Sequence, residues 1–202
     1  MDGVIIPIQD SQVAFWNSIF SVSQKNGEYR KIHEGHRLNY ELMTETFQMD
    51  NDNSTKQILK QGDFATSLVI RQVFHHIGVV AKLISYLCFY FLDQCYAYIW
   101  MPFGVSIAPN VFIKTLIPLI TQLRKMLSSN IITYMEDILI LSQNILTLQY
   151  KTLIIKDYLI QMGWILSMQK SNLNPCRDFE LIGWRWDSKN LAIQLKPKRR
   201  NG

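Results

Sequence analysis

Cysteine is scarce in this sequence. Only three cysteines occur in 202 residues, and the spacing of Cys88, Cys95 and Cys176 matches neither a disulfide framework nor a zinc site. The first ten residues, MDGVIIPIQD, lack the basic region and the small-residue cleavage site of a secretory signal. These absences argue against a disulfide-stabilised secreted domain and predict an intracellular protein, either cytoplasmic or nuclear.

Long apolar runs are also missing. The longest, Leu83 to Leu92, is interrupted by Ser85 and falls well short of the roughly 20 residues that span a bilayer. No membrane helix is therefore expected. The sequence also has no repeat of fixed period and no low-complexity tract. With 48% hydrophobic residues, it can form one domain with a substantial core and room for two lobes.

Neither sign of charge dominates strongly. The 21 lysine and arginine residues exceed the 16 acids by enough to give a net charge of +5. A charge of this size favours contact with a polyanion such as nucleic acid, but ordinary intracellular proteins also reach it. The most basic segment, KPKRR at 196–200, is expected to be a solvated tail or a contact to a nucleic-acid backbone.

Hairpin signals place strands in the first half of the chain. SIFSVSQKNGEYRKI at 18–32 predicts two strands around an Asn26-Gly27 turn, which is the strongest short hairpin signal. YLCFYFLDQCYAYIW at 86–100 predicts two aromatic-rich strands joined at Asp93 and Gln94, although no glycine marks that turn.

Helix signals follow in the second half. A helix from about Ser106 to Ser128 is predicted, with Pro109 in its first turn and Pro118 kinking it. A second helix ends at Gly163, with one buried stripe. The residues of that stripe are Leu148, Ile155, Leu159 and Met162. The last ordered piece, FELIGWRWDSKNLAIQL at 179–195, is read as strand, turn, strand.

Two adjacent acids lie between the helices, in ITYMEDILIL at 132–141. Glu136 and Asp137 separate two short runs of strand-forming residues, which predicts a hairpin with the acids at its tip. Adjacent carboxylates repel each other, so they either stay in water as a polar turn or share a cation. The hairpin between two core-packing helices indicates an α+β layer rather than a regular βαβ repeat.

Several motifs in serial order resemble those of reverse transcriptases. The similarity extends from about Gly3 to Leu195. The family's hairpin motif is an aromatic residue, any residue, then two aspartates, and the matching residues here are Tyr134, Met135, Glu136 and Asp137. The other segments that carry the similarity are KNGEYRKI with RLN, DFATSLVIRQVFHHI, MPFGVSIAPNVF, MGWILSMQKSNL and FELIGWRWDS. The sequence motifs ATSL..RQ.FHHI and GWRWDS are most similar to those of the DIRS-like and LTR-related branch of retrotransposons.

The resemblance implies the fingers and palm of a right-hand polymerase. It predicts fingers at about 10–62 and 78–101, a palm at about 63–77 and 102–195, and a basic tail at 196–202. The palm would be an antiparallel sheet packed on helices, a ferredoxin-like core, and no thumb is expected within the chain. An RNA or DNA primer-template and deoxynucleoside triphosphates are the implied partners. Thumb and ribonuclease H segments would belong to a longer parent protein.

The resemblance also implies a catalytic site in which aspartates hold two Mg²⁺ ions about 4 Å apart. The family's aspartate positions fall on Val69, Glu136 and Asp137, so two of three are altered. Valine offers no oxygen ligand, and glutamate moves its carboxylate by roughly 1 Å. Asp63 lies in the same predicted strand, but roughly 20 Å away. The resemblance therefore predicts a degenerate copy without activity.

Other family positions predict nucleotide contacts. Lys25 and Arg30 match triphosphate-binding positions, or else belong to a solvated hairpin. Phe74 matches the aromatic residue that crowds the sugar 2′ position, or else is a core aromatic. Gly104 would let the backbone approach the nucleotide, unless it is an ordinary turn glycine. Lys170 would contact pyrophosphate, unless it is a surface lysine.

Trp184 and Trp186 match the primer-grip hairpin. Because they alternate on one strand face, packing is expected rather than base stacking. Glu34 and Gly35 depart from the fingers motif of many relatives, which suggests relaxed selection. Three functional classes stay open: an active RNA-directed DNA polymerase, an inactive retroelement remnant, and a nucleic-acid-binding protein that reuses the palm.

Overall fold

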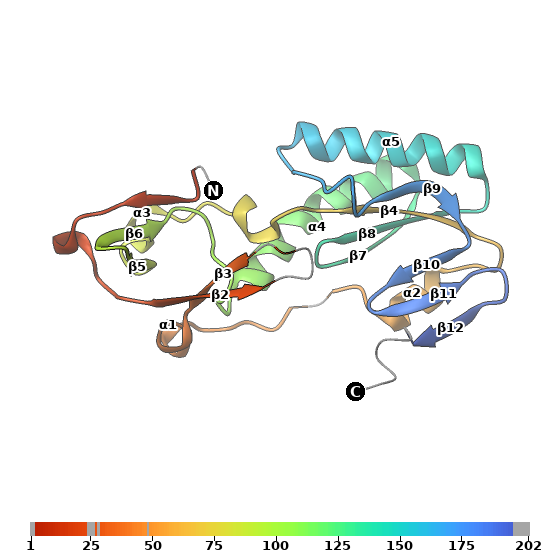
Figure 1. The fold of residues 1–202 in the computed structure, drawn as a ribbon. Helices are drawn as coiled ribbons and strands as arrows, with labels where there is room; N and C mark the ends of the chain where they lie inside the picture. Colours follow the sequence, from red (N-terminus) through yellow and green to blue (C-terminus); the bar gives the residue numbers. More distant parts are fainter. Residues whose placement is uncertain (1–2, 24–26, 28, 48, 196–202) are drawn as a thin grey trace. The chain divides into compact units, whose positions relative to one another are not determined.

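Secondary structure in the computed structural model is described for residues 3–23, 27, 29–47 and 49–195. The chain divides into two units, whose helices and strands are labelled in Figure 1. Unit 1 comprises Met1–Phe47 and Gln72–Lys114, and unit 2 comprises Gln48–Arg71 and Thr115–Gly202. The boundaries expected for fingers and palm stay a prediction.

Unit 1 contains two small antiparallel sheets, with strand orders β1-β6-β5 and β2-β3. Its strands are β1 (Ile5–Pro7), β2 (Ser18–Ser23), β3 (Tyr29–Glu34), β5 (Cys88–Phe91) and β6 (Gln94–Tyr98). Its helices are η1 (Asp10–Gln12), α1 (His36–Glu41), η2 (Val73–His76), α3 (Ala81–Ile84) and the first part of α4 (Ala108–Leu127).

Both predicted hairpins of unit 1 are confirmed. Gly27, between β2 and β3, has a positive φ of 79°, while Asn26 lies outside the described residues. The β5–β6 turn is made by Leu92 and Asp93, which have φ of 47° and 56°, whereas Gln94 is already the first residue of β6. The predicted turn at Asp93 and Gln94 was therefore wrong by one residue. Two consecutive positive φ angles match the type I′ turn, which here forms without glycine.

Unit 2 is built around a four-stranded antiparallel sheet of order β7-β8-β4-β9. Its strands are β4 (Phe64–Val69), β7 (Asn130–Tyr134), β8 (Asp137–Ser142) and β9 (Asn172–Cys176). After β4 the chain passes through the unit 1 elements η2, α3, β5 and β6 before it reaches α4, and α5 (Ile145–Gln161) connects β8 to β9. The elements of the unit 2 core therefore occur in the order β-α-β-β-α-β, and this order with the strand order confirms the expected ferredoxin-like core.

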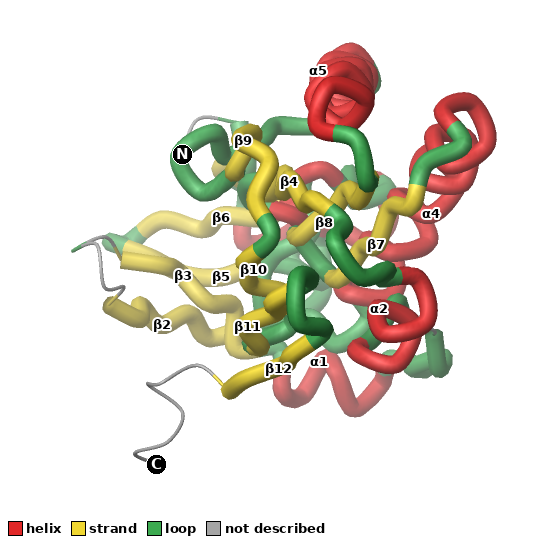
Figure 2. The backbone as a smooth tube through the Cα atoms, turned by 90° about the vertical axis from the view of Figure 1, so that its right-hand side faces the viewer, coloured by secondary structure: helices red, strands yellow, loops and turns green. Residues whose placement is uncertain are grey.

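The two faces of this sheet pack against different elements. Leu68, Ile138 and Ile140 are buried on the helix-covered face, where the Thr66 and Thr152 hydroxyls of β4 and α5 lie 2.6 Å apart. Figure 2 shows α4 and α5 on this side. On the other face, Ala65 and Leu139 belong to a core cluster that also includes residues from the C-terminal strands at 178–195.

The three strands at 178–195 form a second sheet of order β10-β11-β12. They are β10 (Asp178–Leu181), β11 (Trp184–Asp187) and β12 (Ala192–Leu195), and the short helix α2 (Asp52–Ile58) completes unit 2. The sequence predicted only two strands here, so that interpretation was wrong. The missed turn falls at Ile182 and Gly183, both with positive φ, and an isoleucine rarely adopts that conformation.

The two long helices largely follow their sequence signals. Helix α4 begins at Ala108, two residues after the predicted cap Ser106, and contains Pro118. In α5 the predicted stripe is buried except for Met162, which is half exposed beyond the last helical residue. Including Met162 in the stripe was therefore wrong. Across the described part of the chain, no helix combines the length and apolar character needed to span a membrane.

Candidate active site

The acid-bearing hairpin lies at one end of the unit 2 sheet. Asp137 is the first residue of β8 and pairs with Val69 of β4 on one side and Tyr134 of β7 on the other. Glu136 lies in the turn after Met135, and its carbonyl accepts a hydrogen bond of 2.8 Å from the Ile70 N–H. The three positions expected to converge therefore do lie together.

Paired residues on an antiparallel sheet have their Cβ atoms about 5 Å apart. A carboxylate at position 69 would therefore lie directly beside that of Asp137. The valine that occupies this position is half-buried, as is Asp137, whereas Glu136 is exposed. At this position β4 therefore presents methyl groups rather than a second carboxylate beside Asp137, and the repulsion between two facing acids is absent.

The donor set does not fit a pair of Mg²⁺ ions. Hard divalent cations need oxygen ligands, and Val69 has none to offer. Within the described ranges, no group of three or more histidine, cysteine, aspartate or glutamate side chains could hold a metal ion. Asp63 does not fill the gap, because it is buried beyond the opposite end of β4 and accepts a hydrogen bond from the Lys60 N–H.

A serine-containing turn fixes the backbone at position 69. The Val69 N–H donates to Ser171 Oγ at 3.0 Å, and the Val69 carbonyl accepts from the Ser167 N–H at 2.7 Å. The Ser171 hydroxyl in turn donates to the Ser167 carbonyl. Lys170 lies on this same turn, which these hydrogen bonds join to β4, and its side chain is exposed. Neither serine was identified from the sequence motifs.

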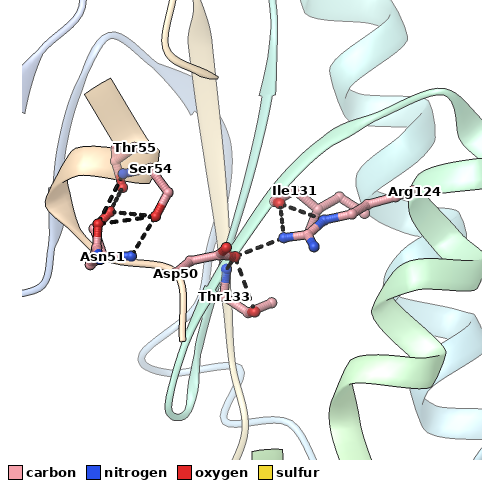
Figure 3. A network of polar contacts seen from close by, with 7 residues as sticks. All are labelled: Asp50, Asn51, Ser54, Thr55, Arg124, Ile131 and Thr133. Atoms are coloured by element: carbon pink, nitrogen blue, oxygen red, sulfur yellow. Dashed lines mark hydrogen bonds and ion pairs between the residues drawn. The ribbon is translucent and has the colours of Figure 1, made fainter. Parts of the chain in front are cut away.

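A second network, also unpredicted, contacts β7 at Ile131 and Thr133 (Figure 3). One carboxylate oxygen of Asp50 accepts from the Thr133 N–H at 2.8 Å and from the Arg124 guanidinium at 2.7 Å. Arg124 also donates to the Ile131 carbonyl through two nitrogens. Asp50 therefore joins the segment before α2 to both α4 and β7.

The two tryptophans of β11 pack, as expected, rather than forming a stacking surface. Trp186 is only 1% exposed, belongs to the core cluster with Ala65 and Leu139, and donates its indole N–H to the Leu181 carbonyl. Trp184 is partly buried against the same cluster. Their contribution here is to hold the second sheet against the first.

Unit 1 contains the remaining candidate residues. Phe74 is buried in η2, with its ring centroid 4.8 Å from that of Phe103 and 6.3 Å from that of Phe112. The core-aromatic interpretation of Phe74 therefore describes its contacts. Arg30 lies in β3 opposite Val22, and Lys25 lies outside the described residues.

Gly104 is explained by close packing against β3. Its φ is 107°, and a Cβ atom there would lie 1.8 Å from the carbonyl oxygen of His33. The Asn39 side chain fixes the same loop, since its amide nitrogen donates to the Gly104 carbonyl and its oxygen accepts from the Ser106 N–H. Asn39 belongs to the RLN motif, but the sequence alone gave it no structural role.

Comparison with known proteins identifies the family. The family model described as "Reverse transcriptase (RNA-dependent DNA polymerase)" matches residues 22–186. The chain belongs to the reverse transcriptase family. This reverse transcriptase domain is 28% identical, over 148 residues, to the Retrovirus-related Pol polyprotein from transposon opus of Drosophila melanogaster. The match covers 71% of the chain and 14% of the polyprotein, and supports a retroelement domain.

Solved structures show the same fold. The foamy viral protease-reverse transcriptase dRH in complex with double-stranded DNA matches 98% of the domain, with a TM-score of 0.85 and 16% identity. The foamy viral enzyme in complex with an RNA/DNA hybrid matches 98%, with a TM-score of 0.76 and 15% identity. The domain spans 33% and 25% of those chains. The fingers and palm fold is thereby confirmed, whereas the roles of individual site residues stay predictions.

Proposed function

We propose that this chain is the reverse transcriptase domain of a retroelement copy that no longer catalyses template-directed DNA synthesis. One observation carries the proposal: Val69 is the direct sheet partner of Asp137. The position best placed to supply a carboxylate beside Asp137 therefore has only methyl groups. A site that must neutralise and orient phosphoryl oxygens through metal ions cannot be completed by these residues.

Glu136 adds a smaller defect. It lies in an exposed turn rather than in β8, and its extra methylene displaces the carboxylate by roughly 1 Å, which can reduce the rate on the order of 100-fold at a positioned site. An aspartate restored at position 69 should therefore recover more activity than an aspartate restored at position 136. The proposal includes two further points. The retroelement is of the DIRS-like branch, and Lys25, Arg30 and Lys170 occupy the positions that contact the nucleotide.

The proposal is tested by restoring aspartate at the two altered positions. Val69→Asp with Glu136→Asp supplies three aspartates, and primer extension on an RNA template with Mg²⁺ is measured for the domain alone and fused to a thumb from a relative. We expect no incorporation by the unchanged domain in either form, and partial activity for the fused repair. Val69→Asn with Glu136→Asp is the matched control, because it has the shape of aspartate without its charge.

Two outcomes would contradict the proposal. Template-dependent incorporation by the unchanged sequence would show that Val69 does not disable the site. A fused repair that binds primer-template but stays inactive would place the defect elsewhere, with Glu34 and Gly35 as the first positions to test. The thumb is included because metal ligands orient reacting atoms but do not hold a duplex in register.

A non-enzymatic nucleic-acid-binding role is the second candidate. It is favoured by the net charge of +5 and by relatives that were solved with double-stranded DNA and with an RNA/DNA hybrid. Binding to an RNA-DNA hybrid should be weak, independent of sequence and steeply reduced by salt, because counterions are released from the phosphates. Fluorescence anisotropy at low and high salt measures this. No detectable binding at low salt would eliminate this role.

A further inference from the structure

The outward face of α5 is apolar, although none of the residues that the structure describes covers it. Leu146, Tyr150, Leu153 and Ile160 are 75%, 66%, 49% and 51% exposed. They lie on the side of the helix opposite the buried residues Leu148, Thr152, Ile155 and Leu159. A helix that is apolar on both faces is the pattern expected for burial on both faces.

The spacing of these residues matches a helix-pairing seam. Positions 146, 150, 153, 157 and 160 are separated alternately by four and three residues, as in the a and d positions of a coiled coil. Asp157 is the one polar member, and it already forms an ion pair with Lys156 of the same helix at 3.2 Å. Closing this stripe against a partner helix would therefore not bury an isolated charge.

We propose that this stripe, Leu146 to Ile160 on the outward face of α5, packs against the same stripe of a second copy of the chain. A second copy presents a helix with identical spacing, and a two-fold arrangement about Leu153, the middle of the stripe, places each apolar stripe against the other. Knobs-into-holes packing needs this match in periodicity between the two helices.

The available area suits a weak, transient pair. Each large apolar side chain that is about half or more exposed leaves on the order of 100 Å² to cover, so the stripe and the stems beside it provide about 500 Å² in each copy. Two copies would bury about 1,000 Å², which is below the roughly 1,200 Å² at which stable interfaces begin and is the size of weak, transient ones. The expected dimer is therefore reversible and concentration-dependent.

Sedimentation equilibrium of the whole chain, from about 1 to 100 μM, tests the proposal. The unchanged chain should self-associate, and Leu153→Lys should weaken the dimer by at least about tenfold, because it places two charges at the centre of the seam. Met126→Lys is the matched control. Met126 lies on α4 and is 58% exposed, but is not part of the stripe. Circular dichroism checks that each variant keeps its helices.

Cross-linking supplies an independent measurement. Leu153→Cys should form a disulfide-linked dimer under mild oxidation, whereas Met126→Cys should not exceed the unchanged chain. A chain that is monomeric at every concentration would overturn the proposal. A dimer that survives Leu153→Lys unchanged would also overturn it, because another surface would then be responsible. Association only after addition of other segments of a longer parent protein would assign the stripe to those segments instead.

Discussion

Val69 and Asp137 are direct partners across β4 and β8, with Asp137 also paired to Tyr134 of β7. This pairing affects the stability of the sheet as well as catalysis. Facing carboxylates on a sheet repel each other, whereas a β-branched residue facing an acid does not, and β-branched residues favour strands. The valine therefore suits the metal-free fold even though it removes an oxygen ligand.

Val69→Asp should accordingly destabilise the metal-free domain by about 1 kcal/mol. Millimolar Mg²⁺ should recover part of that loss, because a cation that binds only the folded state stabilises it. Thermal unfolding in EDTA and in Mg²⁺ measures both effects. Val69→Asn is the control, and its melting temperature should respond to Mg²⁺ no more than that of the unchanged domain. An equal Mg²⁺ response in the Asp and Asn variants would refute the expected ligand role.

Asp50 provides a second prediction. Asp50→Ala leaves the Thr133 N–H and part of the Arg124 guanidinium without their acceptor, so the free energy of unfolding should fall by about 2 kcal/mol. Asp50→Asn keeps one acceptor oxygen and should lose less. Urea unfolding compares them with Asp178→Ala, which removes an exposed ion pair to Arg185 and should change stability by less than about 1 kcal/mol. Similar losses in all three variants would contradict the role given to Asp50.

Gly104→Ala tests the close contact between the Gly104 loop and β3. The added Cβ would collide with the His33 carbonyl at a positive φ, so a loss of more than about 3 kcal/mol is expected. Gly163→Ala is the matched control, because Gly163 also has a positive φ but nothing lies within 4 Å of its Cβ position. That control should cost only about 1 kcal/mol. Urea denaturation gives both values, and equal losses would contradict the steric explanation.

Local sequence signals predicted the elements that local physics determines. The Gly27 hairpin, the acid hairpin and the buried stripe of α5 each follow from residue types a few positions apart. The two errors have different causes. Met162 continues the helical spacing but falls past the last helical residue, because the helix ends just before Gly163, which has a positive φ. Ile182 takes a conformation that its side chain disfavours, so its type gave no turn signal.

The candidate site was predictable only in part. Val69, Glu136 and Asp137 were found through motif order, and their convergence follows from pairing of β4 with β8. The supports of the site were missed because they depend on distant partners. Asp50 and Arg124 are 74 residues apart, and Ser171 is 102 residues from Val69. A polar residue in a loop gives no sign of which distant N–H its side chain will accept from.

His33 is a buried histidine in β3 that neither motif nor spacing identified. Its side chain is 1% exposed, and the ring lies edge-on to that of Tyr98 with centroids 5.6 Å apart. Neither ring nitrogen has a hydrogen-bond partner among the described residues. Burial disfavours the charged imidazolium and lowers the pKa of His33 to about 4. The folded chain therefore resists protonation at a pH where the unfolded chain accepts it.

Stability should consequently fall as the pH is lowered from about 6.5, where an unfolded histidine titrates, to about 4, and this one group should account for on the order of 3 kcal/mol. Above pH 7 it contributes nothing, because both states are neutral. His33→Phe keeps an aromatic ring against Tyr98 and removes the titration. Urea unfolding at pH 7.5 and pH 5 should show a smaller acid-dependent loss in the variant than in the unchanged chain. Some loss should remain, since burial and the neighbouring His76 also lower the pKa of His75. Identical losses in the two proteins would show that His33 is not the group whose protonation opposes folding.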